Sequence, residues 1–232
     1  MCGRYTIVAR ADEIASRFSV EVPSFYQPHY NAAPSQLLPV ITSENPEGIS
    51  LFYWGIPPDR SRNRGVSERI INLRSESILE KPVFRRALQS RRCLVPADGF
   101  YEWKQLGRKT TIPYRFTRKD KGIFSFAGVW EEYEDLAGSA FHTFSILTTE
   151  PNSVVAPIHD RMPVILSRQS EKTWLAPSSQ ESELIIAMEP LRSEELESYT
   201  VSHRVNSVKN DDVTLILPAP ATDQRGNLTL FG

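Results

Sequence analysis

The stretch CLVPADGFYEWKQLGRKTTIPYRFT, residues 93–117, sets the prediction of the fold, because its apolar and polar residues mostly alternate as they do along β-strands. The alternation predicts strands over residues 93–95, 100–105 and 112–117. Gly107 lies between the last two of these strands, where a hairpin needs a turn. The centre of the chain is therefore predicted to be strand-rich.

The same pattern extends to both sides of this hairpin. Seventeen prolines and eleven glycines divide the chain into short pieces, which argues against long helices. Further strands are predicted over residues 5–8, 37–42, 49–53, 69–73, 123–129, 141–149 and 163–166, and helices over 12–18, 83–89 and 167–175. No repeat or linker divides the sequence. We therefore predict one α+β domain over residues 1–232, with a strand-rich, barrel-like mixed sheet, a few short flanking helices, and residues 223–232 as a C-terminal tail.

The composition is that of a globular protein whose charge is balanced overall and uneven along the chain. With 232 residues, of which 40% are hydrophobic and 24% charged, the chain can bury a core, which excludes disorder, collagen and coiled coil. The net charge of -1 excludes a uniformly cationic nucleic-acid-binding protein. Residues 59–92, however, hold ten Lys and Arg against four acids, a local charge of +6. Residues 181–232 hold nine acids against four Lys and Arg, which we interpret as a solvated acidic periphery.

Cysteine and histidine usage argues against a disulfide framework and against a metal site. The two cysteines, Cys2 and Cys93, are too few for the disulfides of a secreted domain, and the sequence holds no C-x-x-C or His-x-x-His pair. No metal and no cofactor are therefore expected. The sequence shows no apolar leader and no run of about eighteen apolar residues. We expect a soluble cytoplasmic protein without membrane contact, associated with the nucleoid if its source is bacterial.

Cys2, followed by Gly3, is the most unusual chemical feature of the sequence. Removal of Met1 would leave an α-amine and a thiol on adjacent carbons, which is a 1,2-aminothiol. Such an amine, with a reference pKa of about 8, is partly neutral at pH 7 and can condense with an aldehyde, after which sulfur closes a five-membered thiazolidine. The same group could instead serve as an N-terminal nucleophile in amide hydrolysis. An inert cysteine is the simplest alternative.

Two strand-like segments carry polar side chains suited to chemistry. In INLRSE, strand alternation places Asn72, Arg74 and Glu76 on one face. In GFYEWK, Glu102 lies among aromatic residues, and partial burial there would raise its pKa toward a value useful for acid–base catalysis. Solvent-facing positions on the strands would explain the same residues.

A loop histidine completes the set of candidates. In PIHDRMPVIL, His159 precedes an apolar strand and lies beside Asp160 and Arg161. An imidazole in such a position can move protons near pH 7. Isolated loop histidines are more often ordinary surface residues, so this signal is weak when taken alone.

Six motifs follow one another along the chain: MCGRY, YNAAP, INLRSE, ADGFYEWK, IHDRMPV and SHRVNSVKN. In this order, and over essentially its whole length, the sequence resembles the SRAP family, the SOS response-associated peptidase domain. The resemblance implies a protein that recognises abasic sites in single-stranded DNA and links to them through its N-terminal cysteine. The product would be a thiazolidine DNA–protein crosslink that shields the lesion, and no cofactor is required.

The resemblance also implies roles for individual residues. The nucleophile of the family corresponds to Cys2 and its DNA-contacting Asn to Asn72, while its active-site Glu and His correspond to Glu102 and His159. Guanidinium groups suit phosphate oxygens and aromatic rings suit bases. The expected DNA-binding residues are Arg4, Asn31, Arg74, Arg85, Tyr101, Trp103 and Thr148. Family members often carry tryptophans after the strand that here ends in FYWGIPP, whereas residues 59–67 supply arginines.

The implied mechanism uses these residues in turn. His159 would move the proton that opens the closed sugar, and the amine of Cys2 would then form a Schiff base. Glu102 would move protons on the amine or carbinolamine, and Asn72 would hold the sugar or the 3′ phosphate. Slow strand cleavage, a lyase activity, would compete with ring closure. Autocatalytic exposure of Cys2 would account for the peptidase activity in the family name.

Two other functions remain open. A glutamine amidotransferase-like N-terminal-nucleophile hydrolase or peptidase would share the Cys-Gly start, although the Asn, Glu and His motifs do not match that class. A noncovalent single-strand-binding module would use the basic segment, with Tyr101 or Trp103 for base stacking.

The C-terminus carries one further motif. NLTLF, which begins at Asn227 and ends at Phe231, resembles the short peptide by which bacterial proteins dock on the replication sliding clamp. The alternative is that its leucines and phenylalanine pack back on the domain.

Overall fold

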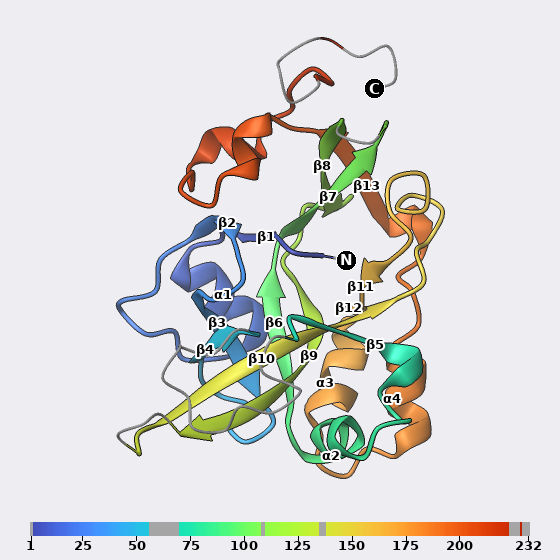
Figure 1. Cartoon of the computed structure of the whole chain (residues 1–232). Coiled ribbons are helices and arrows are strands. Elements are labelled where there is room, and N and C mark those ends of the chain that lie inside the picture. Colours follow the sequence, from blue (N-terminus) through green and yellow to red (C-terminus); the bar gives the residue numbers. More distant parts are fainter. Residues whose placement is uncertain (1, 56–69, 108–109, 135–137, 223–227, 229–232) are drawn as a thin grey trace.

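The computed structural model describes residues 2–55, 70–107, 110–134, 138–222 and 228, and the strands in these ranges form two sheets (Figure 1). The smaller sheet is antiparallel. Its spatial order is β13 (Leu196–Thr200), β8 (Thr111–Arg118), β7 (Gly99–Gln105), β1 (Tyr5–Ile7) and β2 (His29–Ala32). Strands β7 and β8 are the two arms of the hairpin that was predicted around Gly107.

The larger sheet closes on itself. Its spatial order is β11 (Met162–Pro163), β10 (Ala140–Thr149), β4 (Ser50–Trp54), β3 (Leu37–Thr42), β6 (Arg92–Ala97), β9 (Phe124–Glu134) and β12 (Ile165–Leu166). Because β9 also pairs with β10, five strands (β10, β4, β3, β6 and β9) form a barrel. Strand β10 runs parallel to β4 and to β5 (Asn72–Arg74), so the sheet is mixed.

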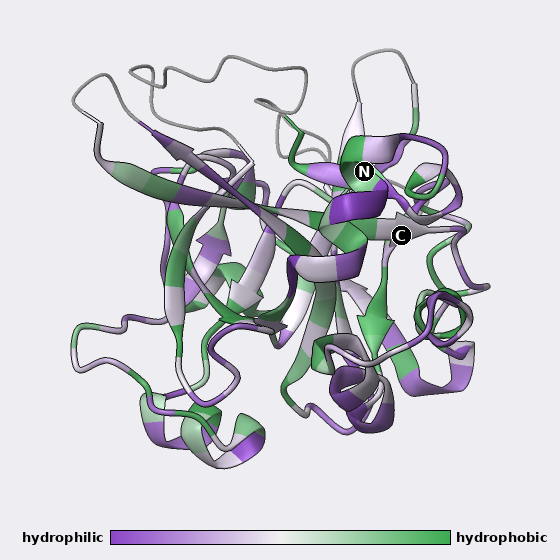
Figure 2. Cartoon of the chain, turned by 90° about the horizontal axis from the view of Figure 1, so that it is seen from below, coloured by the Kyte–Doolittle hydropathy of each residue, from purple (hydrophilic) through white to green (hydrophobic). Residues whose placement is uncertain are grey.

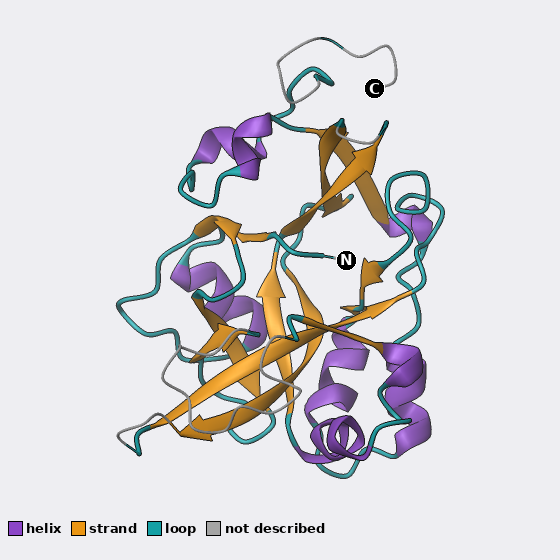
Figure 3. Cartoon of the chain, viewed as in Figure 1, coloured by secondary structure: helices purple, strands orange, loops and turns teal. Residues whose placement is uncertain are grey.

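Short helices flank the sheets. Those in the described residues are α1 (Ala11–Phe18), α2 (Pro82–Ser90), α3 (Arg168–Leu175) and α4 (Glu181–Ala187), with 3₁₀ segments η1 (Ser75–Ser77), η2 (Ser193–Glu195), η3 (His203–Asn206) and η4 (Val213–Ile216). Figure 3 shows α2, α3 and α4 gathered at one end of the molecule. The buried guanidinium of Arg92 donates hydrogen bonds to carbonyl oxygens at the C-terminal ends of both α2 and α3. These carbonyls lack partners within their helices, so Arg92 fastens both helices to β6.

Aromatic side chains join the two sheets around the first strand. Tyr5 in β1 is fully buried, and its ring meets those of Trp54 and Phe126 edge-on, at centroid distances of 5.3 and 5.8 Å. Phe100, which pairs with Tyr5 from β7, contacts the same Phe126 ring at 6.1 Å. Buried rings of this size contribute much of the energy of a core, and hydrophobic residues are concentrated along the strands (Figure 2). Strand β1 is thus anchored to the barrel close to Cys2.

The predicted α+β class, with a barrel-like mixed sheet and short flanking helices, is confirmed. Each predicted strand and helix has a counterpart in the structure, with boundaries that differ by a few residues. The prediction for INLRSE requires a correction, because β5 ends at Arg74 and residues 75–77 form η1. Glu76 therefore does not share a strand face with Asn72. Strands β2 and β13 and helix α4 are additional.

The acidic C-terminal part is only in part the solvated periphery that its charge indicates: its acids within residues 181–222 are exposed or partly exposed, but apolar side chains between them belong to the core. Within residues 181–222, α4, β13, η3 and η4 turn apolar side chains inward, and Leu184, Leu196, Val201, Val205 and Leu215 are buried. The acidic residues lie between these buried apolar positions, so the net charge of the segment did not indicate its apolar pattern.

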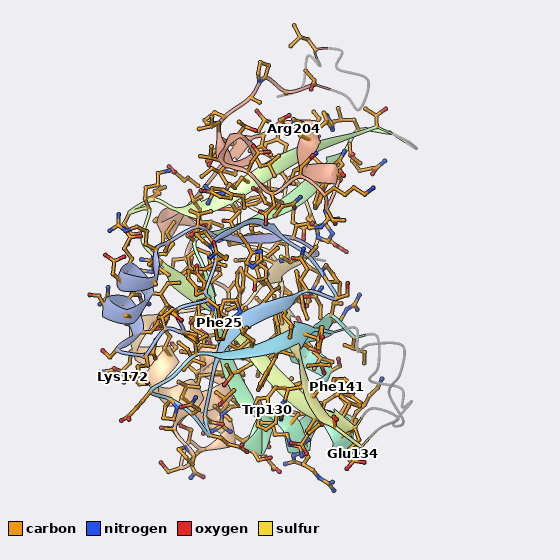
Figure 4. The ribbon with its side chains drawn as sticks, turned by 90° about the vertical axis from the view of Figure 1, so that its left-hand side faces the viewer. Phe25, Trp130, Glu134, Phe141, Lys172 and Arg204 are labelled. Carbon is orange, nitrogen blue, oxygen red and sulfur yellow. The ribbon has the colours of Figure 1, made fainter. Side chains whose placement is uncertain are left out.

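The described part of the molecule is elongated. Arg204, in the C-terminal part, lies at one end, and Glu134 and Phe141, in the β9–β10 hairpin, lie at the other (Figure 4). No helix in the described ranges has the length and the apolar character needed to cross a membrane. Residues 59–67 and most of the NLTLF motif fall outside the described residues, although Leu228 is described and exposed.

Candidate active site

The pairing of β1 with β7 places Cys2 beside Glu102. The backbone N–H of Tyr101 in β7 donates to the carbonyl oxygen of Arg4, just before β1. Continuing this antiparallel register toward the N-terminus places Gly3 opposite Glu102 and Cys2 opposite Trp103, the residue after Glu102. The Cys2 thiol donates to the same Arg4 carbonyl at 3.5 Å, and Cys2 is fully buried. The N-terminal segment thus enters between the small sheet and strands β10 to β12 (Figure 1).

Strand β5 brings Asn72 to the same place from the larger sheet. It runs parallel to β10, with Asn72 opposite Ile146. Asn72 is 8% exposed, and its side-chain Nδ2 donates to the carbonyl oxygen of Cys2 at 2.8 Å. A buried hydrogen bond of this kind is costly to break. It therefore fixes the peptide group of Cys2 relative to the barrel.

Glu102 is a buried carboxyl group. It lies opposite Tyr114 of β8, and its side chain is 3% exposed. Burial disfavours the charged form and raises the pKa of Glu102 to about 7, and the nearby Asp160 carboxylate acts in the same direction. Such a group is present in both protonation states near neutral pH, which is what general acid–base catalysis requires. The raised pKa that the sequence led us to expect is therefore found.

His159 faces Glu102 from the loop between β10 and β11. Its Nε2 lies 3.8 Å from Oε2 of Glu102. The backbone N–H of Arg161 donates to Nδ1 at 3.0 Å, so in the neutral ring the proton is assigned to Nε2, on the side of Glu102. Burial lowers the pKa of His159, and the Asp160 carboxylate opposes this effect. The neutral ring is favoured at pH 7.

Arg161, to which the sequence assigned no role, holds the His159 loop against β5 and β10. Its guanidinium binds both carboxylate oxygens of Glu76, at 2.7 and 2.8 Å, and donates to the carbonyl oxygen of Thr148 at 2.6 Å. The hydroxyl of Thr148 donates in turn to the carbonyl oxygen of Leu73. Hydrogen bonding by Arg161 lowers the pKa of Glu76 and keeps it ionised. Its place two residues after His159 was the sequence signal for this residue.

The structure thus brings together Cys2, Asn72, Glu102 and His159 from four distant segments. Burial raises the pKa of the Cys2 thiol, and the charge of Glu102 adds to this effect, so the thiol is protonated at neutral pH. A thiol in this state needs a base before it can act as a nucleophile, and Glu102 is the carboxyl group whose charge acts on it. Among the residues that the structure describes, no group of three or more His, Cys, Asp or Glu side chains is arranged to hold a metal ion.

Three of the expected DNA-binding residues are buried, which corrects the expectation that they contact DNA directly. Asn31 is 1% exposed, and its amide donates to three backbone carbonyl oxygens within residues 205–210. Tyr101 is fully buried, and its hydroxyl donates to the carbonyl oxygen of Tyr30 at 2.8 Å, so its ring has no free face for a base. Thr148 is fully buried. The hydrogen bonds of Asn31 and Tyr101 instead join separate segments of the protein.

The other four expected residues differ in exposure. Arg74 is exposed at the end of β5, and Trp103 is partly exposed in β7, with its indole N–H bound to a side chain of η3. Arg4 is partly buried and reaches a carbonyl oxygen of η3. Arg85 pairs with Glu181 at 3.0 Å, among the helices at the end of the molecule remote from the N-terminus (Figure 1). Arg74 and Trp103 therefore keep accessible side chains beside the site.

Sequence comparison finds relatives along nearly the whole chain. The family model described as SOS response associated peptidase (SRAP) matches residues 1–208. Abasic site processing protein YoaM of Bacillus subtilis (strain 168) is 41% identical over 221 residues, which cover 93% of this chain and 97% of the relative. Abasic site processing protein YedK of Escherichia coli (strain K12) is 27% identical, covering 94% of this chain and 100% of the relative.

Solved structures show the same arrangement of strands and helices. A crystal structure of a protein from Bacteroides thetaiotaomicron matches with a TM-score of 0.82 at 30% identity, covering 94% of this chain and 100% of that one. A second, from Bordetella bronchiseptica, has a TM-score of 0.74 at 24% identity, covers 87% of this chain and 100% of that one, and shares the fold. Since the family model spans residues 1–208 and YoaM aligns over nearly all of its own length, the chain belongs to the SOS response associated peptidase (SRAP) family.

Proposed function

We propose that this protein captures abasic sites in single-stranded DNA covalently, through the amine and thiol of Cys2 after removal of Met1. The observation that carries the proposal is the meeting of Cys2 with Asn72, Glu102 and His159 at one buried site. The relatives named abasic site processing proteins support the choice of substrate. An abasic site holds a masked aldehyde, and a 1,2-aminothiol can trap an aldehyde as a stable ring.

The first step opens the sugar. The C1′ hydroxyl loses a proton and the ring oxygen gains one as the ring C–O bond breaks, which yields the aldehyde. His159 is suited to this transfer because its ring is neutral and only partly buried, and its Nε2 faces the site. A positioned acid–base group of this kind contributes about 10²- to 10⁴-fold in rate.

The amine of Cys2 attacks the aldehyde before the thiol does, because burial keeps the thiol protonated. A C–N bond forms, and the carbinolamine loses water as Glu102, acting as an acid, protonates the departing hydroxyl. Glu102 then takes the thiol proton while sulfur attacks the carbon of the protonated imine and forms the C–S bond. One water molecule is released, and the former aldehyde carbon becomes part of a thiazolidine. A pKa of about 7 lets Glu102 act first as acid and then as base.

Asn72 has one further polar atom to offer. Its Nδ2 is bound to Cys2, whereas its Oδ1 is buried and has no hydrogen-bond partner among the described residues. A buried acceptor left unpaired is costly. Acceptance of a hydrogen bond from a hydroxyl of the abasic sugar would remove that cost and orient the reacting carbon toward Cys2.

The DNA backbone would pass over the accessible side chains beside this site. Arg74 lies two residues beyond Asn72 and within the basic stretch of residues 59–92, so it is placed for a phosphate contact. Trp103 lies next to Glu102 and is placed to stack on a neighbouring base. Single-stranded DNA fits this arrangement, since a buried aminothiol can reach only a sugar that is not held inside a duplex.

The same chemistry allows two side activities. The imine stage acidifies the adjacent sugar carbon, so elimination with strand cleavage would compete with ring closure. Removal of Met1 by the site itself would be a peptidase reaction and would expose the aminothiol. Strand cleavage needs the imine and therefore the α-amine, whereas removal of Met1 by the site would need the thiol of Cys2. Cys2→Ala should therefore lose the second activity and keep the first.

Intact mass after incubation with a single-stranded oligonucleotide that contains one abasic site tests the proposal. A mass increase equal to the oligonucleotide less one water is expected for the wild type and for Cys93→Ala, whose cysteine lies in β6 outside the site. A glutamine-derived thioester without a DNA adduct would indicate an amidohydrolase. Gel retardation without any increase in mass would indicate a noncovalent binding module.

A further inference from the structure

The surroundings of His159 Nδ1 are unusual, because they offer both a hydrogen-bond donor and an acceptor. The backbone N–H of Arg161 donates to Nδ1 at 3.0 Å. A carboxylate oxygen of Asp160 lies at the same distance, 3.0 Å, from Nδ1. A ring nitrogen that always accepts a hydrogen bond needs only the Arg161 N–H, and one that always donates needs only the Asp160 carboxylate.

Nδ1 therefore has a partner in either protonation state. When Nδ1 carries no proton, its lone pair accepts from the Arg161 N–H. When Nδ1 is protonated, the Asp160 carboxylate at 3.0 Å is the acceptor within reach, and a small turn of the ring or of the Asp160 side chain aligns the N–H with it and away from the Arg161 N–H. A group that carries protons back and forth needs a partner for each half of its cycle.

Exposure falls in steps from Asp160 to Glu102. The side chain of Asp160 is 85% exposed, that of His159 is 22% exposed and that of Glu102 is 3% exposed. His159 joins the other two, with Nδ1 toward Asp160 and Nε2 at 3.8 Å from Glu102. These three side chains lie in order between bulk water and the carboxyl group beside Cys2, and the inner step of 3.8 Å must shorten to hydrogen-bond distance or include a water molecule when a proton passes.

We propose that Asp160 is the outer member of a proton relay, Asp160–His159–Glu102, through which the buried carboxyl group exchanges protons with solvent. The relay rests on the proposed function, in which Glu102 must be protonated when water leaves and ionised when the thiol loses its proton. In this relay Asp160 has no part at the reacting atoms and is a positioning residue that acts through His159.

Over one cycle the relay takes up one proton and releases one proton. Inward, Asp160 takes a proton from water or a buffer acid and passes it to Nδ1, while Nε2 gives its own proton to Glu102. The ring is then neutral with its proton on Nδ1, paired with the Asp160 carboxylate. Outward, Glu102 returns a proton to Nε2, and Nδ1 releases its proton through Asp160 to solvent. The starting state is restored, and no oxidant or other reactant is consumed.

Other charged groups around His159 do not supply this path. From its own loop, Arg161 is charged and bound to Glu76 of η1, so it neither accepts nor donates a proton at neutral pH. From the N-terminal segment, the Cys2 thiol is buried and protonated, and the α-amine of the chain lowers the pKa of His159. Of the carboxylates that act on the ring, Asp160 is the solvent-exposed one.

The test follows adduct formation with abasic single-stranded DNA in the full chain, in dilute buffer across pH 5 to 8. Asp160→Asn keeps the shape of the side chain but cannot carry a proton. We expect the rate constant of adduct formation to fall about tenfold in this variant, which is a small part of what an acid–base group contributes. Adding imidazole at constant pH and ionic strength should restore the rate in this variant and change the wild type little. The limb of the pH profile that reports protonated His159 should move to lower pH, because the carboxylate that favours the imidazolium is gone.

Two variants serve as controls. Asp160→Glu keeps a carboxylate and should retain most of the wild-type rate, whereas a role of the Asp160 side chain in shape alone would favour Asn over Glu. Glu150→Gln removes an exposed carboxylate just after β10 and should leave rate and buffer response unchanged. If Asp160→Asn forms the adduct at the wild-type rate, or is slow but not rescued by imidazole, the relay is wrong while the proposed function stands. Absence of any adduct in the wild type would overturn the proposed function, and the relay with it.

Discussion

Replacing Glu102 with Gln probes the buried carboxyl group without reference to DNA. Burial raises the pKa of Glu102 from an ordinary value of 4.5 to about 7. Between these values the folded protein holds the proton more tightly than the unfolded chain does, so this group makes the free energy of unfolding fall as the pH rises from about 4.5 to 7. At about 1.4 kcal/mol per unit of pKa, the ionised carboxylate destabilises the fold by about 3 kcal/mol above pH 7.

Gln has nearly the same shape and carries no charge, so the variant lacks this pH-dependent cost. We expect Glu102→Gln to exceed the wild type in free energy of unfolding by up to about 3 kcal/mol at pH 8 and to match it near pH 4. Urea unfolding of both proteins at a series of pH values measures the difference, in which the titration of groups that do not interact with Glu102 cancels. Formation of the DNA adduct should slow by about 10² or more, because the acid and base of the reaction is lost. A stability difference that is independent of pH, or a less stable variant at pH 8, would refute the assignment of a desolvated carboxyl group.

Cys2→Ala should abolish the stable adduct. The α-amine remains, so the variant should still form an imine that can be trapped with borohydride. A stable adduct without reductant in intact-mass measurements would contradict the thiazolidine. Arg74→Ala should flatten the plot of log affinity against log salt by about 0.7, one phosphate on single strands, and an unchanged slope in fluorescence anisotropy would remove Arg74 from the DNA path. A peptide of residues 223–232 should bind the sliding clamp of the same organism, and Leu230→Ala combined with Phe231→Ala should remove that binding in the full chain while adduct formation persists. Absence of peptide binding at high micromolar clamp would favour the alternative function of the segment, in which it packs on the domain.

Strand segments were predictable where alternation is clear and turns are marked. The hairpin around Gly107 is one example, because both arms alternate and the glycine stands between them. Strand β13 was missed because LESYT lies among acids, and the local charge outweighed its apolar positions. Strand β2 was missed because HYNA is short and polar, and only its pairing with β1 makes it a strand.

The candidate residues of the site could be identified from the sequence, but their arrangement in space could not. Residue types and motif order identified Cys2, Asn72, Glu102 and His159, but their meeting depends on the parallel pairing of β5 with β10, which local patterns do not encode. The sequence also does not show whether a polar side chain in a strand faces DNA or binds a backbone carbonyl oxygen within the protein. Tyr101 was therefore placed on DNA by sequence, although its hydroxyl is bound inside the protein.

The complete burial of Cys2 also has a consequence for the order of events during synthesis. Residues 1 and 2 are made before the rest of the sequence, but strand β7, which lies beside Cys2, ends only at Gln105. At about 5 to 20 residues per second, roughly the first hundred residues take some 5 to 20 s to make. During that interval the nascent N-terminus is open to aminopeptidases that trim residue 1, and also to metabolic aldehydes that would consume the aminothiol. Folding then buries Cys2, so trimming by an aminopeptidase would come before the N-terminal segment docks on β7, whereas removal of Met1 by the site itself would come after it.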